Sequence, residues 1–353
     1  MLYDNCRRFF MQRKTAGGVE IAHKKMVPGT GGAHYVPYNE RSGEKSTVYF
    51  TEDLSAEGLK KIFERVGGKL HGKVGVKLHT GEQHGPNIIP APWVEELLHD
   101  KLPEANIVET NTYYEGDRYT TEKHRETLKV NGWTFCPVDI LDEDGTAMFP
   151  VKDGKWFTEM SVGKNLENYD SLLVLTHFKG HTMGGFGGSN KNIGIGCADG
   201  RIGKGMIHTV KGSDNLWSIA EEELMERITE STKSVVDHFG ENIVFINILR
   251  NMSVDCDCAG VGAAPVVTPN IGIVASPDIL AADQASVDLV YALKDSDHKD
   301  LVERIETRHG LRQLSYMKEM HMGNDRYHLI NIDEDDKEIL PADAVKNVKA
   351  FQK

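Results

Sequence analysis

Histidine, lysine and cysteine side chains gather in three short stretches of the sequence, and each stretch follows an apolar run. The first is HTGEQH at residues 79–84, the second is HFKGH at residues 177–181, and the third is DCDC at residues 255–258. Neutral imidazole and thiolate groups bind transition metals, and histidine is also a general acid or base near neutral pH. These residue types predict either a transition-metal site or acid–base chemistry.

A transition-metal site would draw its ligands from all three stretches and from one histidine beyond them. Zinc, iron and nickel are the metals that imidazole and thiolate ligands suit here. The predicted metal ligands are His79, His177, His181, His208, Cys256 and Cys258. The alternative for each histidine is a hydrogen bond within a loop, and the alternative for the two cysteines is burial as small apolar side chains.

A glycine-rich stretch, GGFGGSNKNIGIG at residues 184–196, follows HFKGH almost directly. It matches neither the Walker A pattern nor the dinucleotide fingerprint. Glycine permits positive φ and close approach of the backbone, and successive N–H groups can hold an anion. The predicted ligand-binding residues are Gly184, Gly185, Gly187, Gly188, Asn190 and Lys179, and the predicted catalytic residues are His177, His181 and Lys191. The alternative is a loop that needs glycine for its geometry alone.

Strands and helices alternate around these stretches. Apolar and β-branched residues predict strands at 46–50, 73–80, 105–114, 135–141, 171–178, 242–250 and 270–278, and amphipathic patterns predict helices at 54–68, 90–102 and 216–240. Several strands are apolar throughout, which indicates an α/β fold with a largely parallel or mixed sheet flanked by helices. Ligands of such sheets bind outside the carboxyl ends of the strands, so the three stretches are expected to converge there.

Boundaries within the chain are predicted from changes in pattern. Residues 1–44 are expected to form an irregular arm, residues 45–165 and 166–335 two α/β lobes, and residues 336–353 a charged tail. Near the end of the second lobe, Ser276 is the predicted N-cap of a helix with Pro277 at its first position.

The overall composition excludes several classes of partner. The net charge is −12, from 41 Lys and Arg against 53 Asp and Glu, and this opposes binding to nucleic acid or to an anionic membrane. No apolar stretch approaches about 18 residues, so no membrane span is expected. The N-terminus lacks the apolar core of a secretory signal, and five scattered cysteines indicate reduced thiols in the cytoplasm. The expected partner is a small anionic ligand or substrate, and self-association into a homo-oligomer is left open.

Several motifs together resemble the domain-of-unknown-function-362 family, whose members are often labelled iron–sulfur centre proteins. They include KVGVKLHTGE, LLVLTHFKGH, GGFGGSNKNIGIGCADGRIGK and DCDCAGVGAAPVVTPNIGIVAS, and the resemblance extends over roughly residues 46–332. The label implies an electron-transfer role. Many members carry a ferredoxin-like cysteine insert, which is absent after His208 in this sequence, and a cubane cluster needs about four suitably spaced cysteines. A 4Fe–4S cluster is therefore not supported.

A more distant likeness is to the nickel-pincer lactate racemases, in the order of a histidine, a glycine-rich stretch with lysine, and a later histidine. That likeness implies that Lys191 anchors a cofactor and that His79, His177, His181 or His208 moves protons or binds metal. The leading hypothesis is an enzyme of redox or racemase-like type with a metal- or anion-binding cleft. The alternatives are a non-catalytic module that binds a ligand or cofactor, and an iron–sulfur electron-transfer protein.

Overall fold

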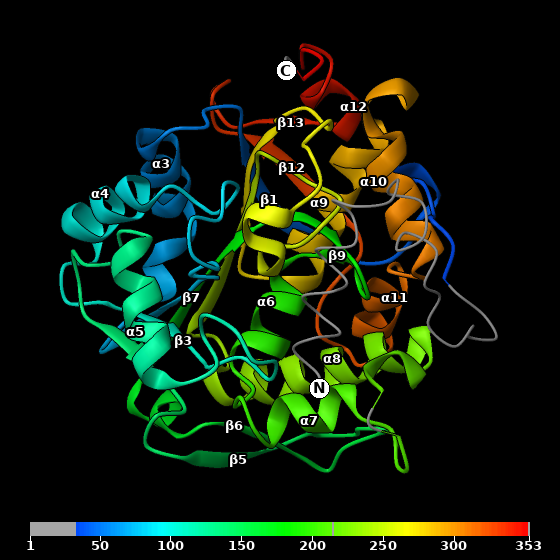
Figure 1. Ribbon diagram of the computed structural model, residues 1–353. Coiled ribbons are helices and arrows are strands. Elements are labelled where there is room, and N and C mark those ends of the chain that lie inside the picture. Colours follow the sequence, from blue (N-terminus) through cyan, green and yellow to red (C-terminus); the bar gives the residue numbers. More distant parts are fainter. Residues whose placement is uncertain (1–32, 214, 352–353) are drawn as a thin grey trace.

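A nine-stranded, mostly parallel sheet runs through the computed structural model, which describes residues 33–213 and 215–351 (Figure 1). Across the sheet the strands are β13 (Lys337–Ile339), β12 (Tyr327–Asn331), β1 (Ser46–Thr51), β11 (Gly272–Ser276), β10 (Ile243–Leu249), β7 (Ser171–His177), β2 (Val74–Lys77), β3 (Asn106–Glu109) and β4 (Val138–Ile140). The five strands from β10 to β4 are parallel to one another, whereas β11 runs antiparallel to both of its neighbours. The predicted α/β class is confirmed.

Helices cover both faces of this sheet (Figure 1). One face packs on α3 (Ala56–Val66), α4 (Ala91–Lys101) and α5 (Thr121–Val130), and the other packs on α6 (Ser189–Gly196), α8 (Glu221–Phe239) and α9 (Ile279–Ala292). Leu172 and Val174 of β7 belong to the second core, whereas Leu173 and Leu175 belong to the first. The fully apolar strands are explained by this arrangement, since alternate side chains enter two separate cores.

The remaining elements are short or lie at the edges. Two hairpins lie outside the main sheet, one of β5 (Thr146–Pro150) with β6 (Glu159–Gly163) and one of β8 (Lys179–His181) with β9 (Gly185–Gly187). The other α-helices of the described residues are α7 (Gly203–His208), α10 (Asp295–Thr307), α11 (Arg312–Glu319) and α12 (Pro341–Ala344). No helix of the described residues is long and apolar enough to cross a membrane.

Two local expectations differ from the structure. Ser276 ends β11 instead of capping a helix, and α9 begins at Ile279 with Asp278 as its N-cap, because the Asp278 carboxylate accepts the Ala281 N–H at 2.9 Å. The glycine-rich stretch forms β9 and helix α6 instead of a loop. Helix α6 packs against α8, a tertiary contact that overrides the low helix propensity of its glycines.

Strands from both predicted lobes, 45–165 and 166–335, lie side by side in the one sheet, where β7 pairs with β2. The lobe boundaries themselves stay a prediction. Most of the predicted arm, residues 1–32, lies outside the described residues, but Arg41 at its end donates two hydrogen bonds to the Asp288 carboxylate of α9. At the other end, residues 337–339 of the predicted tail form β13 at the sheet edge.

Candidate functional site

A cavity of about 330 Å³ lies at the carboxyl ends of the central parallel strands. Its wall takes His79 from the loop after β2, Tyr114 from the loop after β3, His181 from β8 and Cys258 from the segment after β10. Helix α6 adds Lys191, and α7 adds Lys204 and His208. The expectation that the three polar stretches converge at this sheet edge is confirmed, because β10, β7, β2 and β3 are parallel neighbours.

Positive charge exceeds negative charge among the side chains of the wall that are held by ion pairs or hydrogen bonds to the protein. The Lys77 ammonium lies 3.1 Å from the Glu109 carboxylate, and the Arg118 guanidinium lies 3.6 Å from it. Burial by itself would raise the pKa of Glu109, but these two cations lower it to about 2. Lys204 donates to the Thr110 hydroxyl at 2.7 Å, and burial lowers its pKa to about 8. One carboxylate therefore faces three cations, and all three line the cavity together with Glu109.

Lys191 adds a further cation that has no fixed partner. Its ammonium makes no hydrogen bond or ion pair with any described residue, although it lines the cavity. Burial lowers the pKa of Lys191, while the nearby Cys258 and Cys256 raise it. A cation left without a partner in a concave wall is suited to bind an anionic group of a ligand.

His181 presents an N–H group to the cavity. Its Nδ1 accepts the backbone N–H groups of Gly184 at 2.8 Å and Met183 at 3.2 Å, so the proton of the neutral ring lies on Nε2. Burial and the Lys191 charge hold the pKa of His181 well below its usual range. The ring is therefore neutral near pH 7, and its Nε2–H is a hydrogen-bond donor with no partner among the described residues.

His208 has the opposite tautomer. Its Nδ1 donates to the Lys204 carbonyl at 2.9 Å, which leaves the lone pair of the neutral ring on Nε2. Burial lowers the pKa of His208 to about 4. The charges of His208 and Lys191 both act on His181, so these three groups lie within electrostatic reach of one another. The cavity thus holds a neutral acceptor, a neutral donor and an unpaired cation together.

His177 does not line this cavity. Its Nδ1 lies 2.9 Å from both oxygens of the Asp257 carboxylate, and its Nε2 lies 2.7 Å from the Arg250 carbonyl. Both ring nitrogens therefore face acceptors, so neither is open to a ligand. Lys179 lines the cavity but its ammonium lies 3.3 Å from the same carboxylate. Burial would raise the pKa of Asp257, but His177 and Lys179 outweigh it and hold that pKa far below its usual range.

Only some of the predicted ligand-binding residues of the glycine-rich stretch line the cavity. Gly187 and Gly188 line the wall, whereas Gly184, Gly185 and Asn190 do not. The backbone N–H groups of Ser189 and Asn190 donate to the Asp283 carboxylate at 2.7 and 2.9 Å. The anion held by these amides is thus a side chain of the protein itself. A Cβ on Gly188 would lie 2.5 Å from an Asp283 oxygen, so glycine is needed for that close approach.

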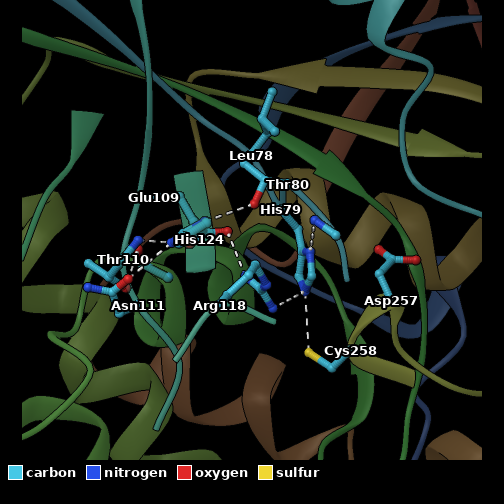
Figure 2. Close-up of polar contacts among 12 residues, drawn as sticks. Leu78, His79, Thr80, Glu109, Thr110, Asn111, Arg118, His124, Asp257 and Cys258 are labelled. Carbon is cyan, nitrogen blue, oxygen red and sulfur yellow. Dashed lines mark hydrogen bonds and ion pairs between the residues drawn. The ribbon is translucent and has the colours of Figure 1, made fainter. Parts of the chain in front are cut away.

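The predicted metal ligands do not form a metal site in the part of the chain that the structure describes. No group of three or more His, Cys, Asp or Glu side chains is arranged there to hold an ion. His79 and Cys258 contact each other at 3.3 Å, but Nδ1 of His79 is occupied by the Gly81 N–H at 2.9 Å (Figure 2). His177 is enclosed by acceptors. The donor set does not fit a resident metal.

Residues 33–213 and 215–351 also contain no set of cysteines that could hold an iron–sulfur cluster. Cys136 packs against the core on the α3–α5 face of the sheet, and Cys197 lies within the core on the opposite face. Cys256 and Cys258 line the cavity, where the other two do not. Two thiolates are fewer than the roughly four that a cubane cluster needs.

Sequence reasoning did not select four charged residues of this wall, one of which is Lys77 at the end of β2. Glu109 ends β3, Arg118 lies in the loop after it, and Lys204 lies on α7. Glu109 could have been selected from the sequence, since it is a polar residue at the end of an apolar strand. His177 occupies the same position on its own strand. Arg118 carried none, because its ion pairs with Glu82 and Glu109 depend on the folding of its loop. Figure 2 shows Arg118 beside Glu109.

Comparisons with known proteins gave one family and several distant structures, two of which are described below. The model of a family described as a domain of unknown function (DUF362) matches residues 74–288. The lactate racemase apoprotein from Thermoanaerobacterium thermosaccharolyticum is 13% identical, with 69% of this chain and 56% of that chain covered and a TM-score of 0.39. A structural-genomics target from Thermotoga maritima is 16% identical, with 55% and 49% covered and a TM-score of 0.33. The chain spans about half the length of these two proteins. No curated protein matches it.

Proposed function

The chain belongs to the DUF362 family, and from the chemistry of its cavity we propose that it is an enzyme that removes a proton from a small anionic substrate, in the manner of a racemase. The observation that carries this proposal is the combination of His181, His208 and Lys191 in one wall. Each of the three has one polar group that the fold leaves unoccupied within the described residues.

The charge of the wall favours an anionic substrate. Lys191 has no partner, and Lys77, Arg118 and Lys204 share one lining carboxylate, Glu109. In a concave site the local dielectric is lower than in water, so an unpaired ammonium attracts a carboxylate more strongly than it would at the surface. The volume of about 330 Å³ is at the small end of the range for ligand pockets, which favours a small molecule.

The two histidines supply the chemistry. The Nε2 lone pair of His208 can take a proton from the carbon next to a carboxylate, and the Nε2–H of His181 can donate a hydrogen bond to the oxygen on which negative charge then develops. The pKa of His208, about 4, is low for a base near pH 7. An anionic substrate beside the ring raises the pKa, because negative charge favours the imidazolium. Return of the proton to either side of the carbon would complete a racemisation.

Proton exchange into small carboxylates tests the proposal. The full chain is incubated in heavy water with two- to four-carbon 2-hydroxy, 2-amino and 2-oxo acids, and deuterium incorporation next to the carboxylate is measured by mass spectrometry. Wild-type protein is expected to catalyse exchange in at least one class. His208→Gln is expected to lower the exchange rate about 10²–10⁴-fold, the usual contribution of a general base.

A matched control is His238→Gln. His238 also has a pKa lowered by burial, but its ring stacks on Phe149 and lies outside the cavity. It is expected to leave exchange unchanged. Calorimetry separates catalysis from binding: a carboxylate that binds wild-type protein without any exchange would make the protein a non-catalytic binding module. Exchange that survives in both His181→Gln and His208→Gln would contradict the assigned roles.

A further inference from the structure

Cys256 and Cys258 form a second reactive feature of the cavity wall, which proton transfer does not use. Cys256 is the N-cap of the short segment η6 (Asp257–Gly262), and Cys258 lies in its first turn. Both side chains line the cavity, and both are free thiols. Cys256 is buried, whereas Cys258 is partly open to the cavity. Of the two sulfur atoms, that of Cys258 is therefore the one a bound molecule can reach.

His79 donates a hydrogen bond to the Cys258 sulfur (Figure 2). The Nδ1 of His79 accepts the Gly81 N–H at 2.9 Å, so the neutral ring carries its proton on Nε2, 3.3 Å from Sγ of Cys258. A histidine in this tautomer cannot take the proton of a thiol through Nε2. It instead stabilises the thiolate form, which accepts the hydrogen bond.

The Cys256 thiol is a second donor to the same sulfur. Its hydrogen bond is the largest influence that holds the pKa of Cys258 well below its usual range, with His79 and Lys191 acting in the same direction against burial. The same hydrogen bond and burial raise the pKa of Cys256. These influences favour the thiolate form of Cys258 and the thiol form of Cys256. Cys197 shows the opposite case, since burial in the core raises its pKa to about 12.

We propose that Cys258 is a covalent nucleophile of this cavity and that it captures small oxo acids, whose carboxylate pairs with Lys191. In the capture step the Cys258 sulfur forms a bond to the carbonyl carbon, and the π electron pair of the carbonyl moves to its oxygen. That oxygen takes a proton from the Lys191 ammonium, which becomes a neutral amine. The product is a thiohemiacetal or thiohemiketal, and no oxidant or reductant is needed. The step depends on the cavity but not on the proton transfer assigned to His208.

Alkylation of the full chain tests the nucleophile directly. Iodoacetate and iodoacetamide each form a sulfur–carbon bond with release of iodide, and peptide mass spectrometry locates the product. Cys258 is expected to react about tenfold faster than Cys136, whose pKa is raised by burial, because a few per cent of an ordinary thiol is ionised at pH 7 and a more acidic thiolate is somewhat less nucleophilic. The preference for iodoacetate over iodoacetamide is expected to exceed that of free cysteine, and Lys191→Met is expected to remove the excess.

His79 is a positioning residue in this proposal, and two variants separate its role from a structural one. His79→Leu removes the donor and is expected to slow alkylation of Cys258, whereas His79→Gln keeps an N–H group and is expected to restore part of the rate. Equal reactivity of Cys258 and Cys136 would overturn the proposal. So would a Cys258 that reacts only after a chelator is added, since that thiol would be a metal ligand.

Covalent capture is then separated from simple occupancy. Glyoxylate labelled with carbon-13 at its aldehyde carbon is expected to give a thiohemiacetal resonance with wild-type protein and none with Cys258→Ser. Acetate, which has the charge but no carbonyl, is expected to protect Cys258 from alkylation less than glyoxylate does. Equal protection by the two, without the new resonance, would mean that the cavity binds carboxylates but forms no bond to them. Neither result depends on proton exchange, so this proposal and the proposed function can fail separately.

Discussion

Two clusters of titratable side chains lie at the carboxyl end of β7, and they differ in whether their polar atoms are already satisfied. In the closed cluster, His177 and Lys179 share the Asp257 carboxylate, and the second nitrogen of His177 faces the Arg250 carbonyl. In the open cluster, His181, His208 and Lys191 each keep one polar group toward the cavity. A histidine after a strand is thus not by itself a site, because its partners decide whether it can act on a ligand.

The largest effect on stability is expected from breaking the closed cluster. Asp257→Asn leaves the Lys179 ammonium and the His177 ring without the carboxylate that both contact, and removal of one member of a buried ion pair costs about 3–5 kcal/mol. Chemical denaturation at pH 7 measures this change in the free energy of unfolding. The matched control is Asp170→Asn, because Asp170 is exposed and accepts a backbone N–H from Lys73. A loss for Asp257→Asn no larger than that of the control would mean that the cluster is not closed.

An intermediate effect on stability is expected at acid pH. It acts through a neutral histidine whose two ring nitrogens both have hydrogen-bond partners. His124 is fully buried between the Thr80 hydroxyl and the Asn111 amide oxygen, and burial lowers its pKa to about 3 (Figure 2). The unfolded chain, with a histidine pKa of about 6.5, takes up the proton first. This contribution to stability is complete above about pH 6.5 and falls by about 1.4 kcal/mol per pH unit toward pH 3.

Denaturation curves at pH 7, 6 and 5 measure this slope. His124→Gln removes the titrating group and is expected to make the stability less steep in pH than that of wild-type protein. Because His208 has a lowered pKa as well, some acid sensitivity is expected to remain in the variant. Identical slopes for the two proteins would show that His124 accepts a proton in the folded state.

The smallest effect on stability is expected in the open cluster. Lys191→Met removes a cation that burial disfavours and that forms no ion pair with a described carboxylate, so the free energy of unfolding is expected to stay within about 1 kcal/mol of wild type or to rise. Calorimetry with a carboxylate that binds wild-type protein is expected to show loss of affinity in the same variant. A strong destabilisation with unchanged affinity would mean that Lys191 is a structural residue, like the members of the closed cluster.

Much of the fold follows from local pattern. The apolar runs at 171–178 and 242–250 contain the strands β7 and β10, and the amphipathic stretch at 54–68 contains α3, whose Ser55 side chain accepts the Gly58 N–H at 3.1 Å. The glycine-rich stretch shows where pattern fails. Its composition predicts a loop, but the Asp283 carboxylate, more than ninety positions later, accepts the N–H groups that begin α6.

The sequence by itself determined that histidine, lysine and cysteine side chains would gather at the sheet edge, because strand ends are readable from apolar runs and the carboxyl ends of parallel strands converge. It could not determine which of those groups are free. Nδ1 of His177 faces Asp257, and its Nε2 faces a carbonyl seventy-three positions away. Nδ1 of His208, in contrast, donates to a carbonyl one helical turn earlier in the chain. Only the tertiary structure decides these partners, because a hydrogen bond depends on distances between atoms, and residues far apart in sequence come within 3 Å only after folding.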